Sequence, residues 1–372
     1  MRQPRRRHPE PALPDPRPAR IVAGCMTGTS IDALDVAVLR IRHFGLRLHA
    51  KLEAASTVPL GKLAAPLRRL ASQEPMPASE IARLQREFAL LHLEALRPLH
   101  EKHKLQLVAV HGQTVYHAPP DSWQLFQPAP LAHGLGVPVV CDLRAADLAN
   151  GGQGAPLTPL ADFILLRHGS EDRAVANLGG FCNLTRLPGS QDIDRIAGRD
   201  VCACNQVLDA VARAALDAPY DRDGHAAMSG HPDERAAGLL AGLLRRQAKA
   251  GRSLGTGDEA GAWVERNRAI TPADLAASAC AAVATVISEA ATGAQRLILA
   301  GGGVRNRRLV LELTARSACP VVLSDDLGVP AAYREAMGWA VLGALCQDRH
   351  HVALPQVTGA ERTAIAGLWC LP

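Results

Sequence analysis

The sequence predicts an α/β protein made of two similar domains. Three observations lead to this prediction. The chain has 372 residues, which is enough for about two domains. A strand, a glycine-containing turn and a second strand occur at 21–41, and the same layout returns about 150 residues later at 173–187. Elsewhere, short apolar strands are interspersed with helical patterns. We expect an extension at 1–20, domains at 21–170 and 171–345, and a segment at 346–372 that packs back on the first domain.

The composition is that of a packed globular chain. Apolar residues make up 48% and charged residues 21%, so disorder of the whole chain is excluded. No run of about 18 apolar residues occurs, and we expect no membrane partner. The net charge is +5, but six arginines against Glu10 and Asp15 place +4 of it in residues 1–20. The remaining chain is nearly neutral, which argues against a nucleic-acid partner.

Residues 1–20 are rich in arginine and proline and lack the apolar core of a signal peptide. We interpret them as a disordered extension, with a mistaken start of the chain and a nucleic-acid arm as the alternatives. The nine cysteines are scattered and form no CxxC pair, which is typical of a reducing, cytoplasmic compartment. Only Cys202 and Cys204 lie close together. A structural role is the main interpretation for them, and a redox or metal role is the alternative.

In the first half of the chain, strands are expected at 21–23 and 34–41, joined by a turn whose N–H groups and hydroxyls are exposed. Leucine and alanine at helical spacing predict two helices within 63–100. A buried strand at 105–110 leads into His111. Another at 137–142 is followed by the glycine-rich loop 148–156.

In the second half, the strand–turn–strand of 173–187 is followed by helical patterns at 206–217, 233–249 and 271–292. A strand at 296–300 runs directly into Gly301-Gly302-Gly303, after which a helix begins. The last expected elements are a strand at 320–323 and a helix at 334–346.

Together, these glycine turns suggest a nucleotide site. Turn N–H groups from two hairpins can grip a polyphosphate from both sides of a cleft. A helix that starts after three glycines lets the nucleotide approach without interference from side chains. Each turn alone is unspecific. Their combination and order therefore carry the prediction of an interdomain nucleotide cleft.

A series of motifs resembles the anhydro-N-acetylmuramic acid kinase family, of the actin, sugar-kinase and heat-shock chaperone superfamily. The motifs follow in family order over residues 21–360: Gly-Cys-Met-Thr-Gly-Thr-Ser-Ile-Asp-Ala-Leu-Asp (24–35), His-Gly-Gln-Thr-Val (111–115), Gly-Gly-Gln-Gly-Ala-Pro-Leu (151–157), Asn-Leu-Gly-Gly-Phe-Cys-Asn-Leu-Thr (177–185), Pro-Tyr-Asp-Arg-Asp-Gly (219–224), Gly-Gly-Gly-Val-Arg-Asn (301–306), Glu-Ala-Met-Gly (335–338) and Val-Thr-Gly-Ala (357–360). The resemblance implies two actin-like (ribonuclease H-like) domains.

The resemblance also implies a reaction. ATP, with Mg²⁺, would phosphorylate the 6-oxygen of 1,6-anhydro-N-acetylmuramic acid while water opens the anhydro bridge. The product would be N-acetylmuramic acid 6-phosphate, in recycling of the cell wall. A carboxylate must deprotonate the water, and the rest of catalysis is positioning and charge neutralisation. The family also forms homodimers, and we expect one here.

The resemblance assigns residues to these roles. Asp200 is the expected catalytic base. Asp32 is the expected neighbour of Mg²⁺, with an Asx cap as the alternative. The sugar is expected at His111, Gln113, Arg144 and Glu335, although His111 could be purely structural. ATP is expected at Gly28, Thr29, Ser30, Ile31, Asp32, Ala33, Leu34, Asp35, Asn177, Gly179, Gly180, Gly301, Gly302, Gly303 and Asn306.

Several positions depart from the family pattern, mostly on the sugar side. The loop after Asp200 is Val201-Cys-Ala-Cys-Asn205 in place of Thr-Gly-Pro-Gly-Asn, and Phe126-Gln127 replaces Gly-Asp. Of three arginines only Arg144 remains, and Leu254-Gly-Thr-Gly-Asp258 replaces Lys-Ser-Thr-Gly-Arg. Fewer cations weaken the grip on an acidic sugar. A kinase for a different amino sugar and a non-catalytic ATP-binding protein are therefore the alternatives.

Overall fold

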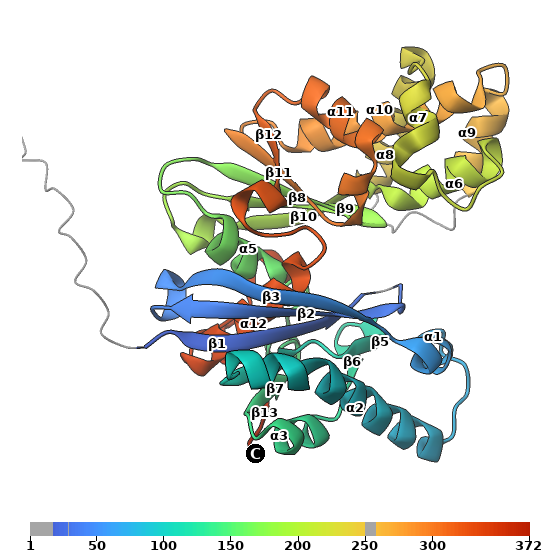
Figure 1. The fold of residues 1–372 in the computed structure, drawn as a ribbon. Helices are drawn as coiled ribbons and strands as arrows, with labels where there is room; N and C mark the ends of the chain where they lie inside the picture. Colours follow the sequence, from blue (N-terminus) through green and yellow to red (C-terminus); the bar gives the residue numbers. More distant parts are fainter. Residues whose placement is uncertain (1–17, 29, 250–257) are drawn as a thin grey trace, which may run out of the picture.

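The computed structural model describes residues 18–28, 30–249 and 258–372. The expectations for residues 1–17, for Thr29 and for positions 254–257 of the altered segment concern residues outside these ranges. The side chains of 247–249 and 258–259 are also outside the description. Two large sheets organise the described chain, and Figure 1 shows them one above the other.

The first sheet has the strand order β13-β7-β4-β1-β2-β3. Strands β1 (Arg20–Thr27), β2 (Ala33–Arg42) and β3 (His49–Pro59) form an antiparallel meander. Strands β4 (Leu107–Val110) and β7 (Val139–Cys141) continue the sheet parallel to β1. The last strand of the chain, β13 (Leu368–Cys370), pairs with β7 and completes the edge.

The second sheet repeats this plan. Strands β8 (Arg173–Leu178), β9 (Phe181–Leu187) and β10 (Ala197–Ala203) form a meander, and β11 (Arg296–Ala300) and β12 (Val321–Leu323) run parallel to β8. The order β10-β9-β8-β11-β12 and its strand directions match β3-β2-β1-β4-β7 of the first sheet. The duplication expected from the two hairpins is therefore present, and the expected α/β class is confirmed.

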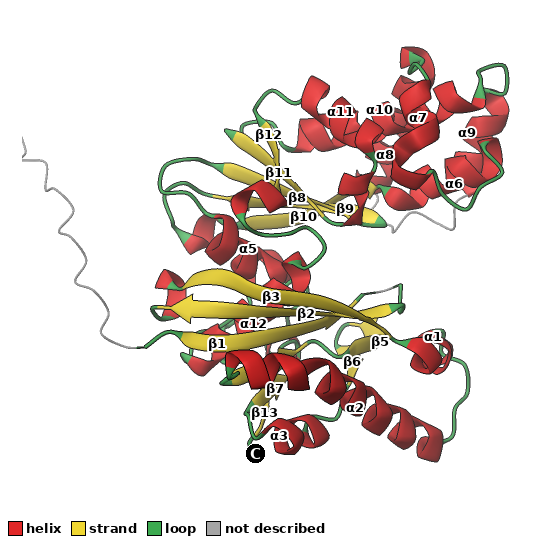
Figure 2. Ribbon diagram, viewed as in Figure 1, coloured by secondary structure: helices red, strands yellow, loops and turns green. Residues whose placement is uncertain are grey.

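Helices cover both sheets, so that sheet and helix layers alternate (Figures 1 and 2). The outer face of the first sheet packs on α1 (Ala64–Ala71), α2 (Ala78–His103) and α3 (Ala129–Leu135). The outer face of the second packs on α6 (Asn205–Ala215), α8 (Glu234–Lys249), α10 (Pro272–Ala290) and α11 (Arg307–Arg316). Between the sheets lie α5 (Thr158–Leu166) and α12 (Arg334–Gln347). Smaller elements are β5 (Gln113–Ala118), β6 (Asp121–Leu125), α4 (Ala145–Leu148), α7 (His225–Ser229), α9 (Asp258–Arg266) and α13 (Pro355–Thr358).

Strand β1 is buried on both faces, which explains its nearly continuous apolar sequence. Val22 points into the core between the sheets, while Ala23 and Cys25 belong to the outer core. Helix α12 lies directly on this strand. A Cβ atom at Gly24 would come within 1.9 Å of the Ala336 carbonyl oxygen, so only glycine permits this approach.

Helix α10 is long and apolar enough to cross a membrane by length and composition alone. In this fold most of its side chains are buried, and it packs against α6, α7, α8 and α11. Its apolar sequence therefore belongs to the core of the second half of the molecule.

Candidate active site

The turn between β1 and β2 carries the first group of expected phosphate-binding residues. The Ile31 N–H donates to the Gly28 carbonyl oxygen at 3.2 Å, and Ile31 adopts a φ of +50°. The Ser30 hydroxyl donates to Asp32 Oδ1 at 2.5 Å. Asp32 itself is exposed beyond the end of the strand. An exposed carboxylate at this turn is accessible to a cation that accompanies a phosphate group.

A second carboxylate, that of Asp35, lies on β2 three residues after Asp32. Asp35 is half-buried, and Oδ1 accepts a hydrogen bond of 2.6 Å from the Thr57 hydroxyl on β3. Burial raises the pKa of Asp35, and the negative charge of Asp32 adds to this rise against the opposing hydrogen bond from Thr57. Two neighbouring carboxylates of this kind attract a cation.

The altered segment 201–205 forms the end of β10 and the start of α6, and it lies against the turn between β8 and β9. The Gly180 carbonyl accepts from Cys204 N–H at 2.8 Å, and the Gly179 carbonyl accepts from Asn205 N–H at 3.0 Å. The substituted residues therefore finish β10 and start α6 against the glycine turn.

The triple-glycine loop lies against the same hairpin. Gly301 has a φ of +83°, and a Cβ there would meet Asn177 Oδ1 at 2.6 Å, so this position requires glycine. Gly302, Gly303 and Asn306 line a cavity of about 550 Å³. Its other lining residues are Asn205, Leu208, Asp209, Tyr220, Asp221, Arg222, Asp223 and Arg305. The cavity volume suits a nucleoside.

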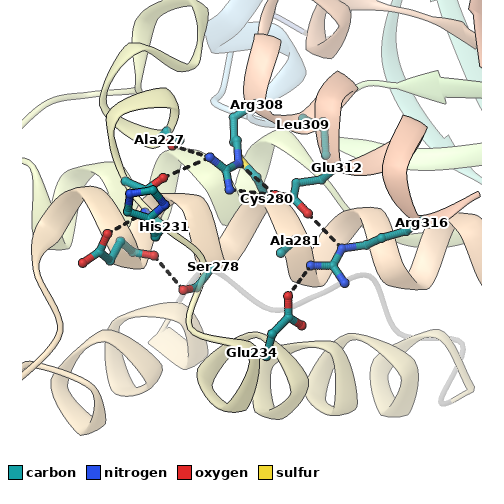
Figure 3. A network of polar contacts seen from close by, with 12 residues as sticks. Ala227, His231, Glu234, Ser278, Cys280, Ala281, Arg308, Leu309, Glu312 and Arg316 are labelled. Atoms are coloured by element: carbon teal, nitrogen blue, oxygen red, sulfur yellow. Dashed lines mark hydrogen bonds and ion pairs between the residues drawn. The ribbon is translucent and has the colours of Figure 1, made fainter.

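A buried polar network around Arg308 connects α11 to the C-terminal end of α7 (Figure 3). Arg308, on α11, pairs with Glu312 at 2.8 Å and donates to the Gly230 carbonyl at 3.0 Å and the Ala227 carbonyl at 3.4 Å. Those carbonyls end α7, which follows the wall formed by 220–224. Glu312 also forms an ion pair with Arg316, and Arg316 forms a second ion pair with Glu234 on α8. The Arg308 guanidinium thus fastens one wall of the cavity to the helix that carries the other.

Asp200 lies in a row of polar residues that crosses the second sheet. In the strand register, Asp200 pairs with Asn183, and Asn183 pairs with Asn177. Directly opposed residues project from the same face, with Cβ atoms about 4.5–5.5 Å apart. At the end of the row, Asn177 Nδ2 lies 3.5 Å from Glu335 Oε1 on α12. The strand register therefore places the expected base and the expected sugar-binding carboxylate along one line.

His111 and Arg144 meet beyond Glu335. His111 is buried and Arg144 is half-buried, and Arg144 Nη2 donates to His111 Nε2 at 2.9 Å. The Nδ1–H of His111 then donates to the Gly112 carbonyl at 2.8 Å, which fixes the neutral tautomer. Burial, together with the Arg144 charge, lowers the pKa of His111 to about 3, against the opposing hydrogen bond with Gly112. Burial also lowers the pKa of Arg144, which the charges of Glu335 and Asp142 partly restore.

Gln113 Oε1 and Arg144 Nε are among the buried polar atoms that have no hydrogen-bond partner within the described part of the chain. Buried polar groups are nearly always paired, so unpaired ones mark a place where a ligand or water completes the site. Both residues were expected on the sugar side.

The glycine-rich loop 151–157 is fixed by the C-terminal motif. Asp147 is buried, and it accepts hydrogen bonds of 2.7 Å from both the Thr358 hydroxyl and the Gly154 N–H. The Gln153 N–H donates to the Thr358 carbonyl at 2.9 Å. A Cβ at Gly198 would contact Pro156 and Pro159, which shows that the loop lies against β10. The strand that carries Asp200 and the loop are thus neighbours.

Comparison with known proteins identifies the family. The sequence model of the anhydro-N-acetylmuramic acid kinase family matches residues 20–370. The chain belongs to this family. It is 35% identical to the anhydro-N-acetylmuramic acid kinase of Salinibacter ruber over 95% of this chain and 96% of the relative, and 35% identical to that of Bordetella parapertussis over 94% and 96%.

Two solved structures that align with the chain are far less similar to it in sequence. An activator of 2-hydroxyisocaproyl-CoA dehydratase from Clostridium difficile aligns with a TM-score of 0.45 at 14% identity, over 87% of this chain and 94% of that one. A ROK family glucokinase from Streptomyces griseus aligns with a TM-score of 0.42 at 14% identity, over 87% and 99%.

The cysteines of this family member do not form a reactive centre in the described residues. Burial raises the pKa of Cys202 to about 12, and it raises the pKa values of Cys182 and Cys204 well above the ordinary thiol range. Such thiols stay protonated and neither bind metals nor attack disulfides readily. The part of the chain that the structure describes also holds no group of three or more metal-ligating side chains. A packing role is therefore favoured for Cys202 and Cys204.

Mg²⁺ fits the first turn of a kinase of this family. The ion usually keeps several waters and binds through one or two carboxylates together with substrate phosphates. Asp32 and the neighbouring Asp35 supply two such carboxylates, and the raised pKa of Asp35 reflects their mutual repulsion in addition to burial.

Sequence reasoning missed four residues that the structure places around this site: Asn183, Arg308, Arg334 and Asp162. Asn183 lies in the motif at 177–185, but the sequence alone assigns it no role. The pairing of β8 with β9 places it opposite Asn177, and the pairing of β9 with β10 places it opposite Asp200. The carbonyls that Arg308 reaches on the far side of the cavity, and the Asp162 partner of Arg334, lie far away in sequence, so no local pattern revealed these contacts.

Proposed function

We propose that this protein transfers the γ-phosphoryl group of ATP to 1,6-anhydro-N-acetylmuramic acid and opens the anhydro bridge with water. The products are N-acetylmuramic acid 6-phosphate and ADP. The observation that carries the proposal is the row from Asp200 through Asn183 and Asn177 to Glu335, with Arg144 beyond it. Family membership supplies the substrate class.

The chemistry balances with these residues. Asp200, exposed at the end of the row, takes a proton from the attacking water, and the water oxygen forms a bond to C1 of the sugar. The bond between C1 and the bridging oxygen breaks, and its electron pair stays on that oxygen, which remains attached to C6. This oxygen attacks the γ-phosphorus, and ADP leaves with the electron pair of the broken phosphoanhydride bond.

Other residues bind and orient the two substrates. The turns at 28–35 and 177–180 hold the phosphates, and the cavity of Gly302, Gly303 and Asn306 receives the nucleoside. Arg144 binds the carboxylate of the sugar, and its orientation is set by the hydrogen bond to His111. Gln113 offers its unpaired Oε1 to a sugar hydroxyl or amide. When bound, Mg²⁺ at Asp32 and Asp35 neutralises charge on the phosphates.

The proposal includes a setting for the enzyme. It works in the cytoplasm, as a homodimer, on a small sugar and ATP, without nucleic acid or membrane. The scattered cysteines and the nearly neutral body of the chain support this, and the homodimer follows the family resemblance.

A coupled ADP-release assay tests the function. ATP and Mg²⁺ are supplied with and without 1,6-anhydro-N-acetylmuramic acid, and products are weighed by mass spectrometry. We expect sugar-dependent ADP and a product heavier than the sugar by one phosphate and one water. ADP release with a neutral amino sugar but not with the anhydro sugar would favour a changed substrate. ATP binding without ADP release on any amino sugar would favour a non-catalytic binding protein.

A further inference from the structure

Three consecutive residues at the beginning of α12 reach three different parts of the molecule. The Tyr333 hydroxyl lies 3.4 Å from Thr57 Oγ1 on β3 of the first sheet. Arg334 reaches α5 in the layer between the sheets. Glu335 reaches Asn177 on β8 of the second sheet. The first turn of α12 is therefore where both sheets and the middle layer meet.

Arg334 and Asp162 form a completely buried ion pair. Arg334 Nε donates to Asp162 Oδ1 at 2.8 Å, and Arg334 Nη2 donates to Asp162 Oδ2 at 2.6 Å. The side chains are 3% and 2% exposed. The Thr185 hydroxyl adds a third contact, 3.3 Å from Asp162 Oδ2. The pair thus connects α12, α5 and strand β9 at one point.

The geometry of this pair restricts the orientation of its neighbour. Two parallel hydrogen bonds fix both the position and the plane of a guanidinium group. In a helix, each residue is rotated by about 100° from the one before it. With Arg334 held on α5, the rotation of the first turn is set, and Glu335 is directed toward Asn177. Glu335 also acts on the half-buried Arg144, because its charge raises the pKa of that guanidinium against the effect of burial.

We propose that Arg334 and Asp162 are positioning residues of the phosphoryl transfer, which hold Glu335 between the polar row of the second sheet and Arg144. This inference rests on the proposed function. Neither residue belongs to the row of Asp200, Asn183 and Asn177. Their effect on the reaction runs through Glu335. A displacement of about 1 Å at a group that orients substrate can cost about 100-fold in rate.

A second ion pair on the same helix provides a matched control. Arg20 on β1 binds Asp348, which follows the last residue of α12, through contacts of 2.6 Å and 3.0 Å. This pair is also largely buried, with side-chain exposures of 12% and 4%. It fastens the opposite end of α12 to the first sheet. A change that merely loosens the helix should act equally at both ends.

The experiment compares four proteins: wild type, Arg334→Lys, the double variant Asp162→Leu/Arg334→Met, and Arg20→Met. The double variant removes both buried charges, so that no unpaired carboxylate remains in the core. Folding is checked by circular dichroism and thermal unfolding. For each protein, kcat and the KM values for ATP and for the anhydro sugar are measured separately.

We expect the double variant to lose about 10- to 100-fold in kcat/KM for the sugar, with the KM for ATP nearly unchanged. Arg334→Lys, which keeps the charge but not the two-point grip, should recover part of this loss. Arg20→Met should keep the kinetic constants of wild type. A double variant with wild-type kcat and sugar KM, or an equal loss in Arg20→Met, would overturn the inference. If the double variant does not fold, wild-type kinetics in Arg334→Lys would overturn the inference.

A separate readout distinguishes failure of this inference from failure of the proposed function. If wild type shows no sugar-dependent ADP release, the proposed function is wrong. Hydrogen exchange of the backbone at 333–340 then decides the positioning role. Faster exchange in the double variant, but not in Arg20→Met, supports a fixed first turn, and equal exchange in all proteins contradicts it.

Discussion

His111 allows a sharp test of the sugar side of the site. It is buried, its ring centroid lies 4.8 Å from that of Trp339, and both ring nitrogens are used, one by Gly112 and one by Arg144. The substitution His111→Phe keeps an aromatic ring against Trp339 but removes both hydrogen-bonding atoms. Arg144 then loses an acceptor, and we expect a higher KM for the sugar with little change in the KM for ATP.

The same substitution has a calculable effect on stability. The pKa of His111 is about 3 in the folded protein against an ordinary value of 6.5. Below pH 6.5 the unfolded chain binds a proton that the folded chain does not. The contribution of this group is therefore fully present above pH 6.5 and is lost as the pH falls toward 3. Between pH 7 and pH 5 the loss amounts to about 2 kcal/mol, at about 1.4 kcal/mol per pH unit.

Urea unfolding at pH 7 and pH 5, followed by circular dichroism, measures this difference. Wild type should lose about 2 kcal/mol more between the two pH values than His111→Phe does. Contributions from all other groups cancel in the comparison. The control His133→Phe changes an exposed histidine on α3, which meets water in both states, and should behave as wild type. An equal pH dependence in wild type and His111→Phe would show that His111 is not held neutral by burial.

Three further predictions concern other parts of the site. Asp200→Asn should retain ATP binding in a thermal shift assay and abolish product; surviving activity would mean that another group is the base. Arg308→Met should raise the KM for ATP about tenfold or more and lower the free energy of unfolding by about 3 kcal/mol. The reason is that Glu312 and two carbonyls lose a buried partner. An unchanged KM for ATP would show that Arg308 does not shape the nucleotide cavity. Thr358→Val removes a hydrogen bond to the buried carboxylate of Asp147. It should lower the free energy of unfolding by about 1.5–3 kcal/mol and raise the KM for the sugar. Wild-type sugar kinetics would show that the loop at 151–157 does not need this hydrogen bond.

Much of the fold was predictable where the hydrophobic pattern is regular. The helices expected at 206–217, 233–249, 271–292 and 334–346 correspond to α6, α8, α10 and α12 within a few residues. Helix α5 was not predicted, because it is buried on nearly all sides and has no polar face to reveal a helical period. Strand β3 was also missed. Its sequence holds three alanines and few large apolar residues, and most of its side chains are only half-buried.

The site was predictable to the extent that local motifs carry it. The glycine turns and Asp200 could be proposed from short segments, and their roles remain predictions. The contacts that connect these segments could not be foreseen. Arg334 and Asp162 are separated by 172 positions, and only the packing of α12 on α5 brings them together. Asn183 became informative only through the pairing of β8, β9 and β10.

The position of α12 on Gly24 has a consequence for biosynthesis. The strands of the first sheet that precede it are complete once residue 141 has left the ribosome, but the helix that covers their inner face begins about 190 residues later. At about 5–20 residues per second, that face waits about 10–40 seconds for its helix. The edge strand β13 arrives later still, at the very end of translation. The first half of this enzyme therefore finishes folding after the second half has been synthesised, and a nascent chain stopped before residue 334 exposes an apolar sheet to aggregation and to chaperones.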